Sequence, residues 1–173
     1  TETRRNLYEN AKVCETVATM CKKIYEQTDL QVVILIEEYS QFCLLKNYLG
    51  VPFEFAHGTV SQDAKKTLPE EYWKSDNAAI VDRFNQGKSR ILIGTSAIST
   101  GVDIQPTGVL FYLQGGKSEI QLKQGIGRGT RPVGPKQLKV FDFIVAGSPT
   151  LERHAKYRNE IYETITDLPI KVY

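Results

Sequence analysis

The chain has 173 residues, of which 41% are hydrophobic and 24% are charged. These proportions are ordinary for one folded domain and exclude a disordered or collagen-like chain. The 22 basic and 20 acidic side chains leave a formal net charge of +2, which excludes a strongly basic nucleic-acid-binding arm, so any contact with nucleic acid must be local.

The cysteines and the length of the apolar runs bear on where in the cell the protein is expected. Cys14, Cys21 and Cys43 are odd in number and lie in apolar patterns, where a free cysteine behaves as a small hydrophobic residue. The most apolar run, residues 32–36, is far shorter than the ~20 residues that a membrane span requires, and we find no signal peptide. We therefore expect a cytoplasmic protein that has no contact with a membrane.

Helical and strand patterns alternate along the first part of the chain. Apolar residues at three- and four-residue spacing predict an amphipathic helix over about residues 4–27. The unbroken apolar run at 32–36 predicts a strand buried on both faces. A helix is expected near 40–49, ended by Gly50, which favours a left-handed turn, and a short strand at 53–56 follows.

The same alternation continues to the end of the chain. We expect a helix over 77–85, closed by turn residues around Gly87, and then strands over 90–94, 109–113 and 138–144.

Two further helices are predicted from their first residues. Ser118 and Gln121 have the spacing of a capping box, in which each side chain satisfies the backbone amide of the other. Pro149 opens a C-terminal helix, because proline is tolerated at a first helical position. The residues that share one face of this helix are Leu151, Ala155, Arg158, Ile161, Tyr162 and Ile165.

This order of elements predicts an α/β three-layer sandwich: an open, mostly parallel sheet with helices on both faces. In such sheets, functional loops follow the carboxyl ends of the strands. We expect residues 1–173 to form a single domain, with 149–173 as its C-terminal helix and tail. The polar segment 61–76 is interpreted as an irregular excursion.

Two loops carry residue types that can bind phosphate. Residues 94–104 (GTSAISTGVDI) follow a buried strand, and their small side chains let backbone amides and hydroxyls approach a phosphate. The alternative is a merely flexible connection. In residues 124–131 (QGIGRGTR), Arg128 and Arg131 stand three apart, which suits a clamp on a polyphosphate. Taken alone, such a pair is more often a solvated basic turn.

The order and spacing of these segments resemble the C-terminal RecA-like domain of superfamily 2 helicases over nearly the whole chain. The first strand and helix resemble motif IV (VVILIEEYSQFCLL), and FAHG resembles the strand and turn that follow it. Residues 81–104 resemble motif V and the segment that leads to it (VDRFNQGKSRILIGTSAISTGVDI). Residues 124–131 fit the Q-x-x-G-R-x-x-R form of motif VI (QGIGRGTR). The two motifs together are a far more specific signal than either alone.

The resemblance implies a role in ATP hydrolysis. Arg131 takes the place of an arginine finger that reaches the γ-phosphate of ATP held by a first lobe, with Arg128 beside it and Gln124 sensing the γ-phosphate. Such a finger can accelerate phosphoryl transfer by ~10³–10⁵. The residues placed on the nucleotide side of the cleft are Gly101, Asp103 and Gly127.

The resemblance also implies a grip on the sugar-phosphate backbone of a nucleic acid. Thr95 and Ser96 would contact the tracking strand, and Gly58 would present its amide to a neighbouring phosphate. Contacts of this kind do not depend on base sequence. They also agree with the near-neutral net charge, because one lobe carries only part of the footprint.

The parts of a complete motor that the sequence lacks are equally informative. No G-x-x-x-x-G-K-[ST] loop and no DExx box after a strand is present. In the resembling proteins these belong to the first lobe. We therefore expect a fragment of a longer protein that needs its N-terminal lobe to hold ATP and Mg²⁺, is inactive alone and binds no metal itself. The oligomeric state stays open, with a monomer favoured.

Two features bear on the branch of the superfamily. Motif VI begins with Gln124, unlike the His-Arg opening of DEAD-box RNA helicases, and Asp142, His154, Arg158 and Tyr162 resemble the tail of phage branch-migration helicases and their bacterial repair relatives. This resemblance implies DNA as the partner, and a role in repair, recombination or replication in a bacterial or phage-infected cell. The insertion at 68–76 departs from that pattern, so its DNA contacts are not carried over.

Other functions stay open at this point. A non-catalytic nucleic-acid-binding module, a nucleotide-binding scaffold that recruits partners, and an RNA helicase lobe are the alternatives. The finger residues of motif VI argue against the first two, because a domain that has lost its motor does not need them.

Several conspicuous residues have structural interpretations that we prefer. His57 is expected to be a turn residue beside Gly58, not a catalytic base. Tyr72 and Trp73 are expected to anchor their own loop and not to stack on a base. Lys65 and Lys66 are expected on a solvated helix face.

Overall fold

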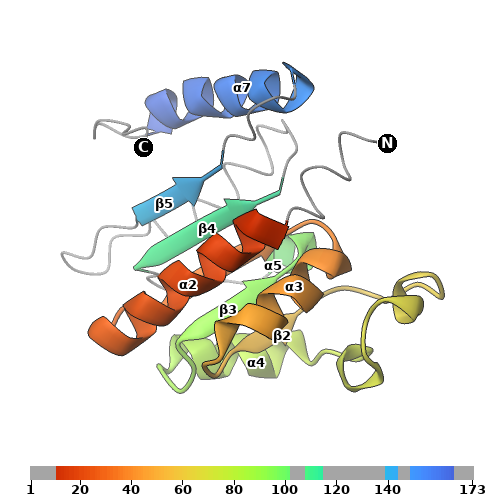
Figure 1. Cartoon of the computed structure of the whole chain (residues 1–173). Coiled ribbons are helices and arrows are strands. Elements are labelled where there is room, and N and C mark those ends of the chain that lie inside the picture. The colour runs from red at the N-terminus through yellow and green to blue at the C-terminus, as the bar shows by residue number, and fades with distance from the viewer. Residues whose placement is uncertain (1–10, 102–107, 115–138, 144–148, 166–173) are drawn as a thin grey trace.

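The computed structural model of the chain describes residues 11–101, 108–114, 139–143 and 149–165. Its centre is a five-stranded sheet in the order β2-β3-β1-β4-β5, in which every neighbouring pair is parallel (Figure 1). The strands are β1 (Val32–Ile36), β2 (Glu54–Ala56), β3 (Ile91–Gly94), β4 (Val109–Leu113) and β5 (Lys139–Asp142). The predicted parallel sheet is therefore confirmed.

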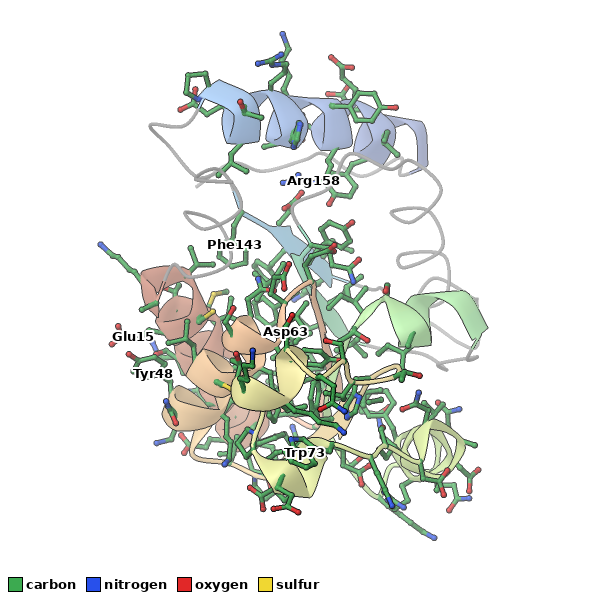
Figure 2. All side chains as sticks on the ribbon, turned by 90° about the vertical axis from the view of Figure 1, so that its right-hand side faces the viewer. Glu15, Tyr48, Asp63, Trp73, Phe143 and Arg158 are labelled. Carbon is green, nitrogen blue, oxygen red and sulfur yellow. The ribbon has the colours of Figure 1, made fainter. Side chains whose placement is uncertain are left out.

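Helices cover both faces of this sheet, as Figure 2 shows with α2 and α3 on one side and α4 and α5 on the other. The described helices are α2 (Ala11–Gln27), α3 (Tyr39–Leu49), α4 (Asn77–Asn85), α5 (Ser96–Gly101) and α7 (Pro149–Ile165). In β1, Val32, Ile34 and Ile36 pack in the α2 and α3 layer, while Val33 and Leu35 pack with α4, α5 and α7. Burial on both faces explains the unbroken apolar run.

Several predicted boundaries are confirmed, and local chemistry explains why. The helix expected over 77–85 is α4, and its first turn is capped by Asp76, whose side chain accepts a hydrogen bond from Ala79 N at 3.2 Å. Gly50 ends α3 in the left-handed region with φ 62°, and Gly87 follows α4 with φ 74°. The helix expected from Ser118 and the start of the first predicted helix lie outside the described residues.

The loop predicted at 94–104 is wrong in part, because residues Ser96–Gly101 form the short helix α5. Ile98 is completely buried beneath the sheet, and its amide donates to Thr95 O at 3.1 Å in the first turn. A Cβ atom on Gly94 would lie 1.7 Å from Ile98 Cδ1. The glycine that we interpreted as a loop signal thus leaves the space that the Ile98 side chain occupies against the strand.

The excursion at 61–76 contains two single turns, η1 (Ala64–Lys66) and η2 (Glu70–Tyr72). Its aromatic residues anchor it, as predicted: Trp73 Nε1 donates to Leu68 O at 2.8 Å, and the Tyr72 ring lies edge-on to Phe42 at 4.8 Å. The ammonium group of Lys65 lies 5.0 Å from the centre of the Trp73 ring.

Arg90 fastens the end of α2 to the start of β3. Its guanidinium donates to Tyr25 O at 2.8 Å and Leu30 O at 3.2 Å, and also to the carbonyls of Ile24 and Thr28. The last carbonyls of a helix have no partner within the helix and favour a positive charge, which explains this arrangement. Sequence reasoning did not single out Arg90.

A buried cluster holds α7 against β5. Arg158 binds the Asp142 carboxylate with both Nε, at 2.7 Å, and Nη2, at 3.0 Å, and Tyr162 donates to the same carboxylate at 2.8 Å. Burial lowers the pKa of Arg158, but the hydrogen bonds and charge of Asp142 outweigh this effect, so the pKa is raised. Three of the four residues singled out in the C-terminal tail therefore meet in one cluster.

We predict that Arg158→Met lowers the free energy of unfolding by about 3 kcal/mol, because it leaves a partly buried carboxylate without its charge partner. Adding Asp142→Asn to this variant removes the carboxylate that has lost its partner. The double variant should therefore lose less unfolding free energy than the two single variants lose together. Chemical denaturation of all three variants measures the coupling.

The matched control for this cycle is Arg153→Met, which replaces an exposed arginine of the same helix. Its stability should stay close to wild type. Additive effects, within about 0.3 kcal/mol, would show that Arg158 and Asp142 are not energetically coupled.

Candidate functional site

The candidate site lies along the carboxyl edge of the sheet. Because all strand pairs are parallel, the segments that follow them emerge at one edge, and Figure 2 looks onto this edge. Gly58 and Thr95, expected to contact a nucleic-acid backbone, follow the neighbouring strands β2 and β3.

The structure brings these predicted residues together. Ala56 and Gly94 are partners in the β2–β3 register, and Thr95 N donates to Ala56 O at 3.2 Å. A Cβ atom on Gly58 would lie 3.6 Å from the Cβ of Ala97 in the first turn of α5. The turn after β2 and the segment after β3 therefore form one continuous surface.

Two hydrogen-bond donors on this surface are open. Within the described residues, neither the Gly58 amide nor the Thr95 hydroxyl has a hydrogen-bond partner. Gly58 is exposed, Thr95 is half-buried, and the neighbouring Ser96 is exposed. Unpaired donors at an accessible edge can bind an oxygen acceptor such as a phosphate.

His57 lies in the turn after β2, as expected, and is buried with 3% of its surface exposed. Its Nδ1 lies 2.7 Å from Gly58 O, and the carbonyl can only accept, so Nδ1 carries the proton. Its Nε2 is buried and, in the part of the chain that the structure describes, has no hydrogen-bond partner. A ring enclosed in this way cannot act on a substrate as a base.

Sequence reasoning missed two buried glutamines that join the ends of β1 and β4. Gln41 Nε2 donates to Leu113 O at 3.0 Å, and its Oε1 accepts from the amides of Glu37 and Glu38 at 2.8 and 3.0 Å. Gln114 Nε2 donates to Ile36 O at 3.0 Å. The available signal was a polar residue bordering an apolar run, but their partners are 72 and 78 positions away.

The predicted ATP-site residues Asp103, Gln124, Gly127, Arg128 and Arg131 lie outside the described residues. The remaining predicted ATP-site residue, Gly101, is the last residue of α5. The roles of all six residues stay predictions. Gln114 is the last described residue before the segment that carries motif VI.

The two buried cysteines, Cys14 and Cys21, are not candidates for chemistry. Burial raises the pKa of Cys14 to about 11 and that of Cys21 to about 12, so both thiols stay protonated near neutral pH. The described residues include no group of three or more metal-ligating side chains that could hold an ion. Across the same residues, no helix has the length and apolarity that a membrane crossing demands.

Several solved structures are similar to this chain. The C-terminal domain of the DEAD-box protein Dbp5 superposes with a TM-score of 0.60 at 17% identity, covering 88% of this chain and 79% of that one. Saccharomyces cerevisiae Dbp5 bound to RNA and ADP BeF3 superposes with a TM-score of 0.59 at 16% identity, and the match covers 87% of this chain and 36% of that one. The DUF1998 helicase MrfA bound to DNA and AMPPNP superposes with a TM-score of 0.59 at 16% identity, and the match covers 87% of this chain and 20% of that one.

These similarities confirm the expected RecA-like fold, and this chain spans well under half the length of the last two proteins. No curated protein sequence matches the chain. The family of helicase conserved C-terminal domains matches residues 15–133, which is more than half of the chain. The chain therefore belongs to the helicase conserved C-terminal domain family.

Proposed function

We propose that this chain is the second motor lobe of an ATP-dependent superfamily 2 helicase or translocase. In this role it supplies an arginine finger to ATP held by an N-terminal lobe and grips the backbone of a nucleic-acid strand. The observation that carries the proposal is the pair of donors Gly58 N and Thr95 Oγ1, which lie at adjacent strand ends of a family member and have no hydrogen-bond partner among the described residues.

The chemistry of these two donors supports a grip on the backbone. An amide and a hydroxyl can both donate to phosphate oxygens, and neither distinguishes one base from another in that contact. Their fixed spacing follows from the β2–β3 register, so they can hold one stretch of backbone while the lobes move. Ser96, exposed at the start of α5, extends the same surface.

The nucleotide half of the proposal rests on the order of the motifs. We assign Arg131 as the finger, with Arg128 and Gln124 beside it, and place Gly101, Asp103 and Gly127 along the nucleotide. ATP and Mg²⁺ would be held mainly by the N-terminal lobe. Support comes from the glutamine ties at the ends of β1 and β4, which fix the point from which the chain continues toward motif VI.

We further propose DNA as the nucleic acid, in repair, recombination or replication. The support is Gln124 at the start of motif VI, together with the tail in which Asp142, Arg158 and Tyr162 form one cluster. The similar structures include Dbp5 bound to RNA and MrfA bound to DNA, so RNA is the competing partner and must be tested directly.

We predict that Arg131→Ala in the full-length protein lowers the rate of nucleic-acid-stimulated ATP hydrolysis by ~10³ or more, because charge that develops on the γ-phosphate loses its counterpart. Nucleic-acid binding, measured by fluorescence anisotropy, should be retained. Arg153→Ala is the control for removing an exposed arginine. Wild-type turnover in Arg131→Ala would refute the assignment of the finger.

Thr95→Ala should raise the nucleic-acid concentration that gives half-maximal stimulation of ATP hydrolysis by roughly five- to tenfold, the equivalent of one ordinary hydrogen bond. Thr95→Ser keeps the hydroxyl and should behave like wild type. If Thr95→Ala has the wild-type half-saturation point, the threonine does not contact the strand.

The choice between DNA and RNA is tested by unwinding. We predict ATP-dependent unwinding of forked DNA and of four-way DNA junctions by the full-length protein, and at least tenfold slower unwinding of an RNA duplex of the same sequence. Equal or faster unwinding of the RNA duplex would replace DNA with RNA in the proposal and leave the motor assignment intact.

A further inference from the structure

We propose that Asn77 is a positioning residue that aims the Gly58 amide at the nucleic-acid backbone. This inference rests on the proposed function, because it concerns a contact that the proposed motor would make. Asn77 is the first residue of α4, and sequence reasoning gave it no role.

The outer edge of β2 creates the need for such a residue. β2 pairs on one side only, with β3, and on that side Ala56 O accepts from Thr95 N at 3.2 Å. Backbone groups of alternate residues point the other way, and they need partners when they are not in water. Here those groups belong to Phe55 and His57.

Side chains that precede and begin α4 take the place of a neighbouring strand. Asn77 Oδ1 accepts from His57 N at 3.2 Å, and Asn77 Nδ2 donates to His57 O at 2.9 Å. The Ser75 hydroxyl lies 2.5 Å from Asn77 Oδ1 and 3.4 Å from Phe55 O. One side-chain amide thus holds both backbone groups of His57. Because the His57 N–H can only donate, the orientation of the amide is fixed.

This contact determines the direction of the Gly58 amide. His57 O and Gly58 N belong to the same peptide group, and in a trans peptide the C=O and N–H bonds point in opposite directions. With His57 O held outward by Asn77, the Gly58 N–H is turned toward the side of β3. A second tie, from His57 Nδ1 to Gly58 O at 2.7 Å, holds the next peptide group as well.

The Gly58 N–H is left open because the ladder between β2 and β3 stops there. Continuing the parallel pattern, it would donate to Thr95 O. Instead, Thr95 O accepts from Ile98 N at 3.1 Å as the chain turns into α5. The Gly58 N–H therefore has a fixed direction and lies next to the Thr95 hydroxyl. Neither group has a hydrogen-bond partner in the described residues.

Imidazole packing keeps the turn from relaxing. The His57 ring lies edge-on to Tyr39, with centroids 5.7 Å apart, and tilted on Phe55 at 4.9 Å. The ring is therefore held from the core, while Asn77 holds the backbone from the outer edge. Loss of Asn77 should free the peptide group to rotate without unfolding the sheet.

The test uses the full-length protein and measures ATP hydrolysis against the concentration of single-stranded oligothymidylate. Asn77→Ala should raise the half-saturating concentration roughly five- to tenfold, as expected for loss of one aligned hydrogen bond. The maximal rate at saturating oligonucleotide and the KM for ATP should stay within about twofold of wild type, because the nucleotide site is untouched.

Two variants separate positioning from stability. Asp76→Ala removes the cap of the same helix without touching the turn, so it should lower stability but leave half-saturation unchanged. Asn77→Asp keeps the acceptor for His57 N and places an acid in the first turn, which favours the helix, but it loses the donor to His57 O. It should therefore retain stability and still show the defect. Ala78→Asp, at an exposed neighbouring position, controls for the added charge.

The outcomes are distinct. If Asn77→Ala has the wild-type half-saturation point while Thr95→Ala is impaired, the positioning role is wrong and the motor assignment stands. Equal defects in Asp76→Ala and Asn77→Ala, in proportion to their loss of stability, would also overturn the positioning role. A wild-type protein without nucleic-acid-stimulated hydrolysis overturns the proposed function, and this inference with it.

Discussion

The ends of a buried parallel sheet leave backbone groups that must find partners, and this constraint shapes the whole domain. Side chains supply those partners from distant parts of the sequence. Gln41 and Gln114 join the ends of β1 and β4, Asn77 closes the outer edge of β2, and Arg90 closes the end of α2. The contacts of Gln41, Gln114 and Asn77 fix elements at the carboxyl edge, where the candidate site lies, whereas Arg90 acts at the opposite edge, before β3.

At the candidate site, one backbone amide of the strand ends has no hydrogen-bond partner within the described residues. In the described residues the ends of β1 and β4 are joined by side chains, but the ladder between β2 and β3 ends one bond early because α5 begins at once after β3. Gly94 leaves room for the Ile98 side chain of this helix against the strand. This packing in the core bears on the Gly58 amide, which has no partner within the described residues, since a longer β3 would pair it internally.

The sequence allowed the sheet and the longer helices to be predicted because burial on both faces demands an apolar run, as in residues 32–36 and 109–113. The end of α4 was equally clear, since turn residues around Gly87 follow it, whereas the cap at Asp76 was found only in the structure. The short helix α5 was missed because glycine, serine and threonine favour loops locally, whereas the burial of Ile98 helps to stabilise the helix. The roles expected for Gly58 and Thr95 came from the resemblance in motif order, whereas Asn77 depends on a partner 20 positions away that no local pattern reveals.

Three of the described arginines are held by contacts within the fold. Arg83 pairs with Glu54, Arg90 holds carbonyls at the end of α2, and Arg158 is enclosed with Asp142. These charges serve the fold, so the proposed grip at the β2–β3 edge depends on neutral donors. Neutral donors release no counterions when they bind a phosphate. Their contribution is geometric, and a contact of fixed geometry is what a lobe needs if it is to hold a strand in one nucleotide state and release it in the next.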